Sequence, residues 1–122
     1  MTELQAIASR IAARLIERGE TVGVSESAAG GLIAAALLAV PGASRYFLGG
    51  GVVYTAAARE ALLGIGTVEM AGMRSASEPY AQLAARAIRN RLGATWGLAE
   101  TGAAGPTGNP GAPTQQVRRA RH

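Results

Sequence analysis

One short segment places a serine where a strand is expected to turn into a helix. Residues 25–31 read Ser-Glu-Ser-Ala-Ala-Gly-Gly and lie between an alternating apolar segment and an alanine-rich one. Backbone N–H groups at a helix start are unpaired and carry partial positive charge, so they stabilise an oxyanion or a phosphate. Ser27 is therefore a candidate nucleophile. The alternative, and the commoner role of such a serine, is to cap the helix.

Other polar residues lie near expected strand ends. Tyr54 precedes Arg59 by five residues, and the plainer interpretation is a half-buried core tyrosine followed by a solvated arginine. Glu26 and Glu100 each lie near the C-terminal end of an expected strand, the edge at which open α/β sheets bind ligands. Each is a base, an orienting group or, more commonly, the partner of an arginine.

A glycine-rich run from Gly102 to Gly111 follows the last expected strand, as phosphate-binding loops do. It lacks the Lys-Ser/Thr ending of a P-loop and matches no dinucleotide-binding fingerprint. Glycine- and proline-rich segments are more often simple loops or linkers, so this signal is weak on its own.

The amino-acid composition argues against several kinds of catalytic chemistry. The 122 residues include no Cys, and the one His is His122, so a disulfide framework, a cysteine nucleophile and a Ser-His-Asp triad are all disfavoured. All 12 basic side chains are Arg and all 8 acidic ones are Glu, which leaves no lysine base and no Asp pair for a divalent cation. We expect neither a metal nor a cofactor.

The charge and hydropathy patterns indicate which kinds of partner are not expected. The net charge of +4 comes mainly from Arg118, Arg119 and Arg121, so no basic stripe follows the body of the chain and a nucleic-acid partner is not expected. No apolar run is long enough for a membrane span, and the N-terminus does not resemble a signal peptide. We therefore expect a cytoplasmic protein with no membrane partner.

These residues must be positioned by alternating helices and strands. Apolar spacing with capping residues predicts helices over 4–16, 32–40, 56–63 and 77–92, and strands over 20–26, 46–54 and 95–100. This order is typical of an α/β fold. We expect one domain over residues 1–113 and a basic tail over 114–122 with no core element. Three strands make a thin sheet for four helices. An unpaired edge strand can pair with another chain, and a homodimer is the expected assembly.

The order of motifs resembles the CinA C-terminal domain family. The segments are SESAAGG, VPGASRYFLGGGVVYTAAAREALLGIG, SASEPYAQLAARAIRNRLGA and GLAETGAAGPTG, which together cover roughly residues 3–108. Characterised members of this family are nicotinamide-mononucleotide (NMN) amidohydrolases. The resemblance implies a three-layer α/β/α sandwich, here lacking its last strand or strands, and metal-free hydrolysis of NMN to nicotinic acid mononucleotide and ammonia.

The resemblance also implies site residues. The family's nucleophilic serine falls on Ser27, a family tyrosine on Tyr54, and the lysine that helps to activate the serine on Arg59. Substrate contacts are implied for the segment around the serine and for the family's Gly-x-x-Gly-Pro loop. In this chain these are Glu26, Ala29, Gly30, Gly31, Gly102, Gly105 and Pro106.

The departures from the family pattern leave two functions open. Ala28 and Ala29 replace a Cys and a Thr, Ala56 replaces an Asn, and Arg59 replaces the lysine. An arginine cannot accept a proton, because its pKa lies above about 12, although it can still hold a phosphate or support Tyr54. The chain is expected to be an NMN amidohydrolase or, alternatively, a degenerate paralogue that binds a nucleotide or a protein partner without turnover.

Overall fold

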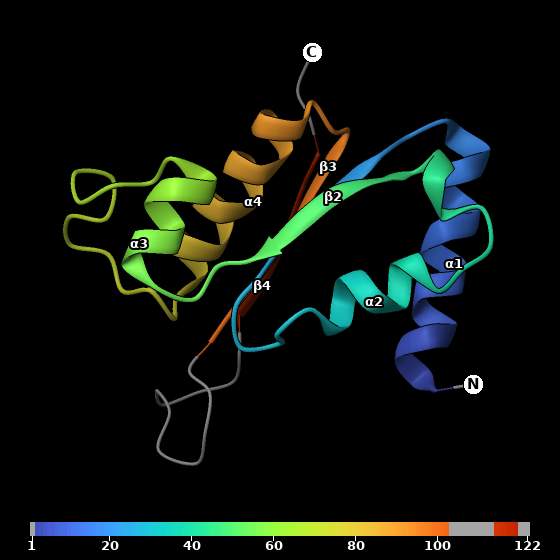
Figure 1. Cartoon of the computed structure of the whole chain (residues 1–122), viewed down its shortest axis with the longest axis horizontal. Helices are drawn as coiled ribbons and strands as arrows, with labels where there is room; N and C mark the ends of the chain where they lie inside the picture. The colour runs from blue at the N-terminus through green and yellow to red at the C-terminus, as the bar shows by residue number, and fades with distance from the viewer. Residues whose placement is uncertain (1, 103–113, 120–122) are drawn as a thin grey trace.

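The computed structural model describes residues 2–102 and 114–119, the latter as backbone only, and shows an α/β fold built on one sheet. In the described residues the strand order is β2-β1-β3-β4, in which β1, β2 and β3 run parallel and β4 is antiparallel to β3. Helices α1 and α2 lie on one side of the sheet, and α3 and α4 lie on the other (Figure 1). The strands are β1 (Val22–Glu26), β2 (Phe47–Val52), β3 (Trp96–Thr101) and β4 (Thr114–Arg119).

The two long helices begin and end at the capping residues that the sequence predicts. Helix α1 (Glu3–Arg18) opens with a capping box between Thr2 and Gln5 and ends at Gly19, whose φ is 64°. Helix α4 (Glu78–Leu92) opens on Ser77, which accepts a hydrogen bond from the amide of Tyr80, and ends at Gly93. The shorter helices are α2 (Leu32–Leu38), α3 (Ala56–Ala58) and a 3-10 turn (Ala43–Arg45).

The glycine run of β2 allows two strand backbones to lie close together. A Cβ atom added at Gly50 would lie 2.5 Å from the carbonyl oxygen of Val24 in β1. Glycine inside a strand often marks the close approach of another backbone or a ligand, and here the neighbouring strand β1 is that backbone. After a register shift between Val22 and Gly23, residues 23–26 of β1 pair one for one with residues 49–52 of β2, so the two strands end side by side.

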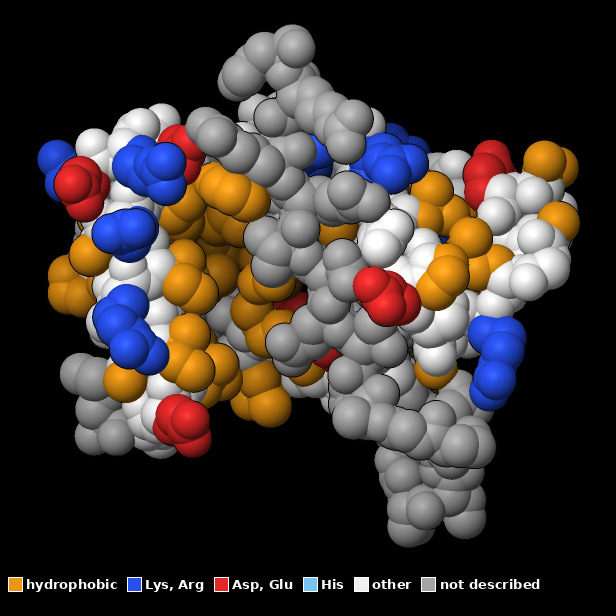
Figure 2. Space-filling view, turned by 180° about the vertical axis from the view of Figure 1, so that it is seen from behind, with side chains coloured by type: hydrophobic (Ala, Val, Ile, Leu, Met, Phe, Trp, Pro, Cys, Tyr) orange, Lys and Arg blue, Asp and Glu red, His pale blue; other side chains and the backbone are white. Residues whose placement is uncertain are grey.

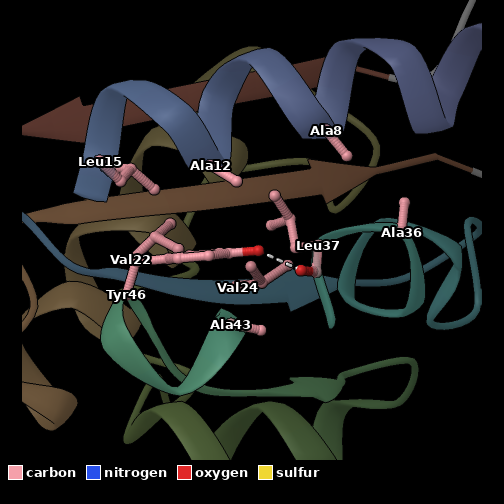
Figure 3. Close-up of a cluster of buried hydrophobic side chains, with 9 residues drawn as sticks. All are labelled: Ala8, Ala12, Leu15, Val22, Val24, Ala36, Leu37, Ala43 and Tyr46. Carbon is pink, nitrogen blue, oxygen red and sulfur yellow. Dashed lines mark hydrogen bonds between the residues drawn. The ribbon is translucent and has the colours of Figure 1, made fainter. Parts of the chain in front are cut away.

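The hydrophobic core lies on both faces of the sheet. On the α1 and α2 side, Tyr46 is wholly buried among small and aliphatic side chains, and its hydroxyl donates a hydrogen bond to the carbonyl oxygen of Leu37 (Figure 3). On the other side, Val53, Leu63 and Ile65 pack against α4. Two separate clusters are what a sheet covered by helices on both faces requires.

The structure corrects the sequence predictions in two places. Residues 114–122 are not simply a tail, since Thr114–Arg119 forms β4 along the edge of β3. This strand was missed because its sequence, Thr-Gln-Gln-Val-Arg-Arg, has almost no apolar alternation, whereas an edge strand can be held by backbone pairing. The predicted helix over 56–63 is α3 followed by a π-helix over Arg59–Leu63.

Among the described residues, no helix combines the length and the apolar character needed to cross a membrane.

Candidate functional site

A cavity of about 220 Å³ lies where the parallel strands end. Its lining comes from β3, from the segments that follow β1, β2 and β3, and from α4. The lining residues are Ser27, Val53, Tyr54, Arg59, Ser75, Tyr80, Thr101 and Gly102. The C-terminal edge of a parallel sheet is where ligands of open α/β folds bind, so we take this cavity as the candidate site.

Ser27 lines this cavity and does not cap α2. The cap is the buried carboxylate of Glu26, which accepts hydrogen bonds from the amides of Gly31 at 3.2 Å, Ile33 at 2.9 Å and Ala34 at 2.9 Å. The capping interpretation of Ser27 is therefore wrong. Its hydroxyl makes no hydrogen bond with another described residue, which leaves the oxygen available to a ligand in the cavity.

Glu100 fixes the backbone that carries Ser27. Its Oε1 accepts hydrogen bonds from the amides of Ser27 at 2.9 Å and Ala29 at 2.8 Å. Its Oε2 is buried without a hydrogen-bond partner among the described residues. Within the described side chains neither Glu100 nor Glu26 pairs with an arginine, and both accept hydrogen bonds from backbone amides instead.

These two carboxylates change the electrostatics expected at the start of α2. The sequence analysis assigned the helix-start amides to an oxyanion, but the amides of Ala29 and Gly31 already donate to Glu100 and Glu26. Each carboxylate brings a negative charge to the place where the helix dipole is positive. The helix start is therefore satisfied from within the protein, and a substrate that used these amides would have to displace a carboxylate.

Arg59 also lines the cavity and is the first residue of the π-helix that follows α3. Its guanidinium carbon lies 5.0 Å from the ring centroid of Tyr80, a cation–π distance, and its Nε is buried without a hydrogen-bond partner among the described residues. Burial raises the pKa of Tyr80, and the adjacent Arg59 guanidinium partly opposes this shift by hydrogen bonding and by its charge. π-Helical turns are frequent at functional sites.

Tyr54 is not the core tyrosine of the plainer interpretation. Its side chain is 59% exposed and lines the same cavity as Ser27 and Arg59. The structure thus brings together all three residues that the sequence analysis nominated as catalytic, from the segments that follow β1 and β2.

Sequence reasoning missed four lining residues, namely Val53, Ser75, Tyr80 and Thr101. Thr101 donates a hydrogen bond from Oγ1 to the carbonyl oxygen of Ser75 at 2.6 Å, which ties the loop before α4 to the end of β3. Its position directly after Glu100 was a signal that could have found it. Nothing in the local sequence distinguishes Tyr80, on the first turn of α4, from a core aromatic residue.

Only some of the residues predicted to contact substrate line the cavity. Gly102 lines the cavity, whereas Glu26, Ala29, Gly30 and Gly31 do not. Gly105 and Pro106 lie outside the described residues. The described part of the chain also has no group of three His, Cys, Asp or Glu side chains placed to hold a metal ion.

Comparisons with known proteins agree on one family. The model of the CinA C-terminal domain matches residues 4–118. A CinA-like protein from Gloeobacter violaceus is 46% identical over 102 residues, covering 84% of this chain and 24% of that protein. A CinA-like protein from Prochlorococcus marinus is 46% identical over 104 residues, covering 85% of this chain and 24% of that protein. The chain thus spans about a quarter of the length of these curated relatives.

Solved structures show the same fold. A competence-damaged protein (CinA) superfamily protein from Klebsiella pneumoniae has a TM-score of 0.83 and 26% identity, with coverage of 99% of this chain and 85% of that chain. A competence/damage inducible protein from Agrobacterium tumefaciens has a TM-score of 0.81 and 28% identity, with coverage of 98% and 82%. The sheet and its helices are therefore shared with both proteins.

Proposed function

The chain belongs to the CinA C-terminal domain family, and on that premise we propose that its cavity hydrolyses the carboxamide of nicotinamide mononucleotide. The products are nicotinic acid mononucleotide and ammonia, the reaction that the sequence resemblance implies. One observation carries the proposal: Ser27, Tyr54 and Arg59, up to 32 positions apart in the sequence, line one cavity at the ends of the parallel strands.

The chemistry requires a nucleophile and a route for its proton. Ser27 Oγ forms a bond to the carboxamide carbon, and its proton passes to the hydroxyl of Tyr54, which gives its own proton to the amide nitrogen. The carbon–nitrogen bond breaks, ammonia leaves, and the nicotinoyl group is held as an ester on Ser27. A water molecule then cleaves this ester, giving the carboxylate product and restoring the serine hydroxyl.

Arg59 has an electrostatic role in this scheme. Because a guanidinium stays protonated, it cannot take the proton that a lysine in the same place could accept. It can place a fixed positive charge beside the negative charge that develops on the substrate oxygen, or hold the phosphate of the nucleotide. Tyr80 positions Arg59 through the cation–π contact.

The size of the cavity limits how the substrate is held. Its volume of about 220 Å³ is smaller than the roughly 300–1,000 Å³ of small-molecule sites. Within the described residues it therefore accommodates the amide-bearing ring, and the ribose phosphate extends out beside Gly102. Gly30 and Gly31, which do not line this cavity, would contact the outer part of the nucleotide.

Binding without turnover is the second candidate function. The observation that favours it is the replacement of the expected lysine by Arg59, since losing a general base costs ~10²–10⁴-fold in rate. The occupied amides of Ala29 and Gly31 point the same way, because an oxyanion would lack those donors.

Ammonia release from NMN tests both candidates. Turnover by the natural chain that disappears in Ser27→Ala, and persists in the exposed-serine control Ser44→Ala, would establish the amidohydrolase. If the natural chain releases no detectable ammonia and Arg59→Lys does, at a rate higher by roughly 10²-fold or more, then only the general base is missing. If neither the natural chain nor Arg59→Lys releases ammonia, and NMN raises the melting temperature of the natural chain, the result would establish binding without turnover. No turnover and no change in melting temperature would exclude both.

A further inference from the structure

The described lining of the candidate cavity carries one charged side chain, and its charge is positive. Five lining residues carry a hydroxyl group, one carries a guanidinium and none carries a carboxylate. The hydroxyls belong to Ser27, Tyr54, Ser75, Tyr80 and Thr101, and the guanidinium belongs to Arg59. Hydroxyl and guanidinium groups donate hydrogen bonds, so this lining favours a ligand group that accepts several hydrogen bonds and is negatively charged.

Arg59 has no acidic side chain of this protein as its partner. Its Nε is buried without a hydrogen-bond partner among the described residues, and its guanidinium carbon lies 5.0 Å from the ring centroid of Tyr80. No ion pair joins Arg59 to a glutamate among the described side chains. All 8 acidic residues of the chain belong to the described residues, so the rest of the chain has no acidic side chain to supply one.

The other arginines with described side chains are solvated or hydrogen-bonded. Figure 2 shows arginines and glutamates together along the outer edge of α1, where water solvates both charges. Only Arg59 and Arg89 are not exposed among these arginines, and Arg89 donates hydrogen bonds to the side-chain oxygen of Asn90. A partly buried charge costs free energy unless it is paired. Arg59 is therefore the arginine that an anionic ligand would stabilise most.

The proposed hydrolysis, on which this step rests, creates an anion inside the cavity. The carboxamide of the substrate is neutral, and its NH₂ group donates hydrogens as a guanidinium does, so only its carbonyl oxygen can accept from Arg59. The carboxylate of the product has two accepting oxygens and a negative charge. A guanidinium binds such a group through charge-assisted, often bidentate hydrogen bonds, so Arg59 interacts more favourably with the product than with the substrate.

We propose that Arg59 makes the cavity a carboxylate pocket that binds the acid product more tightly than the amide substrate. The ligand class is an aromatic carboxylate, whose ring fits a cavity of about 220 Å³. The product then competes with the substrate for the cavity, and its slow release limits turnover. Arg59 thus sets the preference between the two ends of the reaction.

Nicotinate and nicotinamide are matched probes, because they share one ring and differ only in the acid and amide groups. Each is titrated by calorimetry at neutral pH into the full chain carrying Ser27→Ala, in which the proposed nucleophile is absent and no amide is consumed. We expect nicotinate to bind at least roughly tenfold more tightly, the gain of a hydrogen bond to a charged group over a neutral one. Inorganic phosphate, the third probe, should bind more weakly than nicotinate.

Substitutions in the same background make the test specific to one guanidinium. Arg59→Gln removes the charge and should abolish the preference for nicotinate. Arg86→Gln is the matched control, because Arg86 is exposed on α4 and does not line the cavity, and it should leave the preference unchanged. If Arg59→Gln does not fold by circular dichroism, Arg59→Lys takes its place and should weaken the preference, since a lysine cannot form the bidentate pair.

Product inhibition measures the consequence for turnover. In ammonia release by the natural chain, nicotinic acid mononucleotide should inhibit competitively, with an inhibition constant below the KM for NMN. A chain that releases ammonia without this inhibition would overturn the proposal.

The binding results stand apart from the test of hydrolysis. Equal binding of nicotinate and nicotinamide, no binding of either, a preference that Arg59→Gln retains, or tighter binding of phosphate than of nicotinate would each overturn the carboxylate pocket. A preference that depends on Arg59, in a natural chain that releases no ammonia, would refute the proposed hydrolysis and support the pocket.

Discussion

At the scale of single residues, the burial of Tyr46 makes the free energy of unfolding depend on pH in the alkaline range. Its side chain is fully buried, and burial raises its pKa above the ordinary value near 10. Above about pH 10 the unfolded chain therefore loses this proton while the folded chain keeps it, so the free energy of unfolding falls as the pH rises. Below about pH 10 both states hold the proton and this dependence is absent.

We expect Tyr46→Phe to be less stable at pH 7 by about 1–2 kcal/mol, because the carbonyl oxygen of Leu37 loses its donor. The gap to the natural chain should narrow above pH 10. The chain contains no Lys and no Cys, so no other side-chain type that ordinarily titrates near pH 10 contributes to this pH dependence. Urea unfolding from pH 7 to 11.5 measures the effect, with the core variant Val24→Ala as a control whose curve runs parallel to that of the natural chain. A constant gap for Tyr46→Phe would contradict the argument.

The sequence could nominate Ser27, Tyr54 and Arg59, because their types and spacing carry a chemical pattern within short segments. It could not say what Glu26 and Glu100 do, since their hydrogen-bond donors are fixed only when β3 lies beside β1 and the chain turns into α2. A buried carboxylate that accepts amide hydrogens looks, in sequence, the same as one that faces an arginine.

At the scale of elements, the packing of α4 on β3 depends on the absence of one side chain. A Cβ atom at Gly97 would lie 2.0 Å from the carbonyl oxygen of Ala85 and 2.9 Å from Cβ of Arg89. No real contact is that short, so Gly97→Ala must push the helix away from the sheet. The helix carries Tyr80, which positions Arg59, so the displacement would also reach the cavity.

We expect Gly97→Ala to lower the free energy of unfolding by about 3 kcal/mol or more, at or above the upper end of what overpacking of a core usually costs. Gly66→Ala is the matched control, because its new Cβ would meet only the flexible carboxylate of Glu69, at 3.4 Å. That control should stay within about 0.5 kcal/mol of the natural chain. Equal urea midpoints for the two variants would show that α4 can adjust freely.

Elements with strong local signals were predicted, and elements that depend on their neighbours were not. Helices α1 and α4 are capped by Thr2 and Ser77 at their N-termini and by glycines at their C-termini, as their sequences indicate. The π-helix over Arg59–Leu63 has no local signature, since its backbone is set by packing against α4. Strand β4 is held by its pairing with β3, which a search for apolar periodicity does not detect.

At the scale of the whole molecule, β4 closes one edge of the sheet. Six residues, Thr114–Arg119, pair antiparallel with Trp96–Thr101, and α4 lies against β4 as well as β3. The order β2-β1-β3-β4 therefore leaves β2 and β4 as the outer strands and keeps β3, which carries Glu100 and Thr101, inside the sheet. Strand β4 thus covers the outer edge of β3, the strand whose Glu100 accepts the hydrogen bond from the amide of Ser27.

Removing β4 should expose β3 and change both stability and assembly. A chain that ends after Pro113 loses all six pairs, and we expect its free energy of unfolding to fall by at least about 2 kcal/mol, since each hydrogen bond contributes ~0.5–1.5 kcal/mol. The bared edge of β3 would also template pairing between chains. Urea unfolding and sedimentation measure the two effects, and a chain that ends after Arg119 is the control because it keeps β4. The mass of the natural chain in the same runs tests the expected homodimer. A shortened chain as stable as the control, with an unchanged mass, would mean that β3 does not need this neighbour.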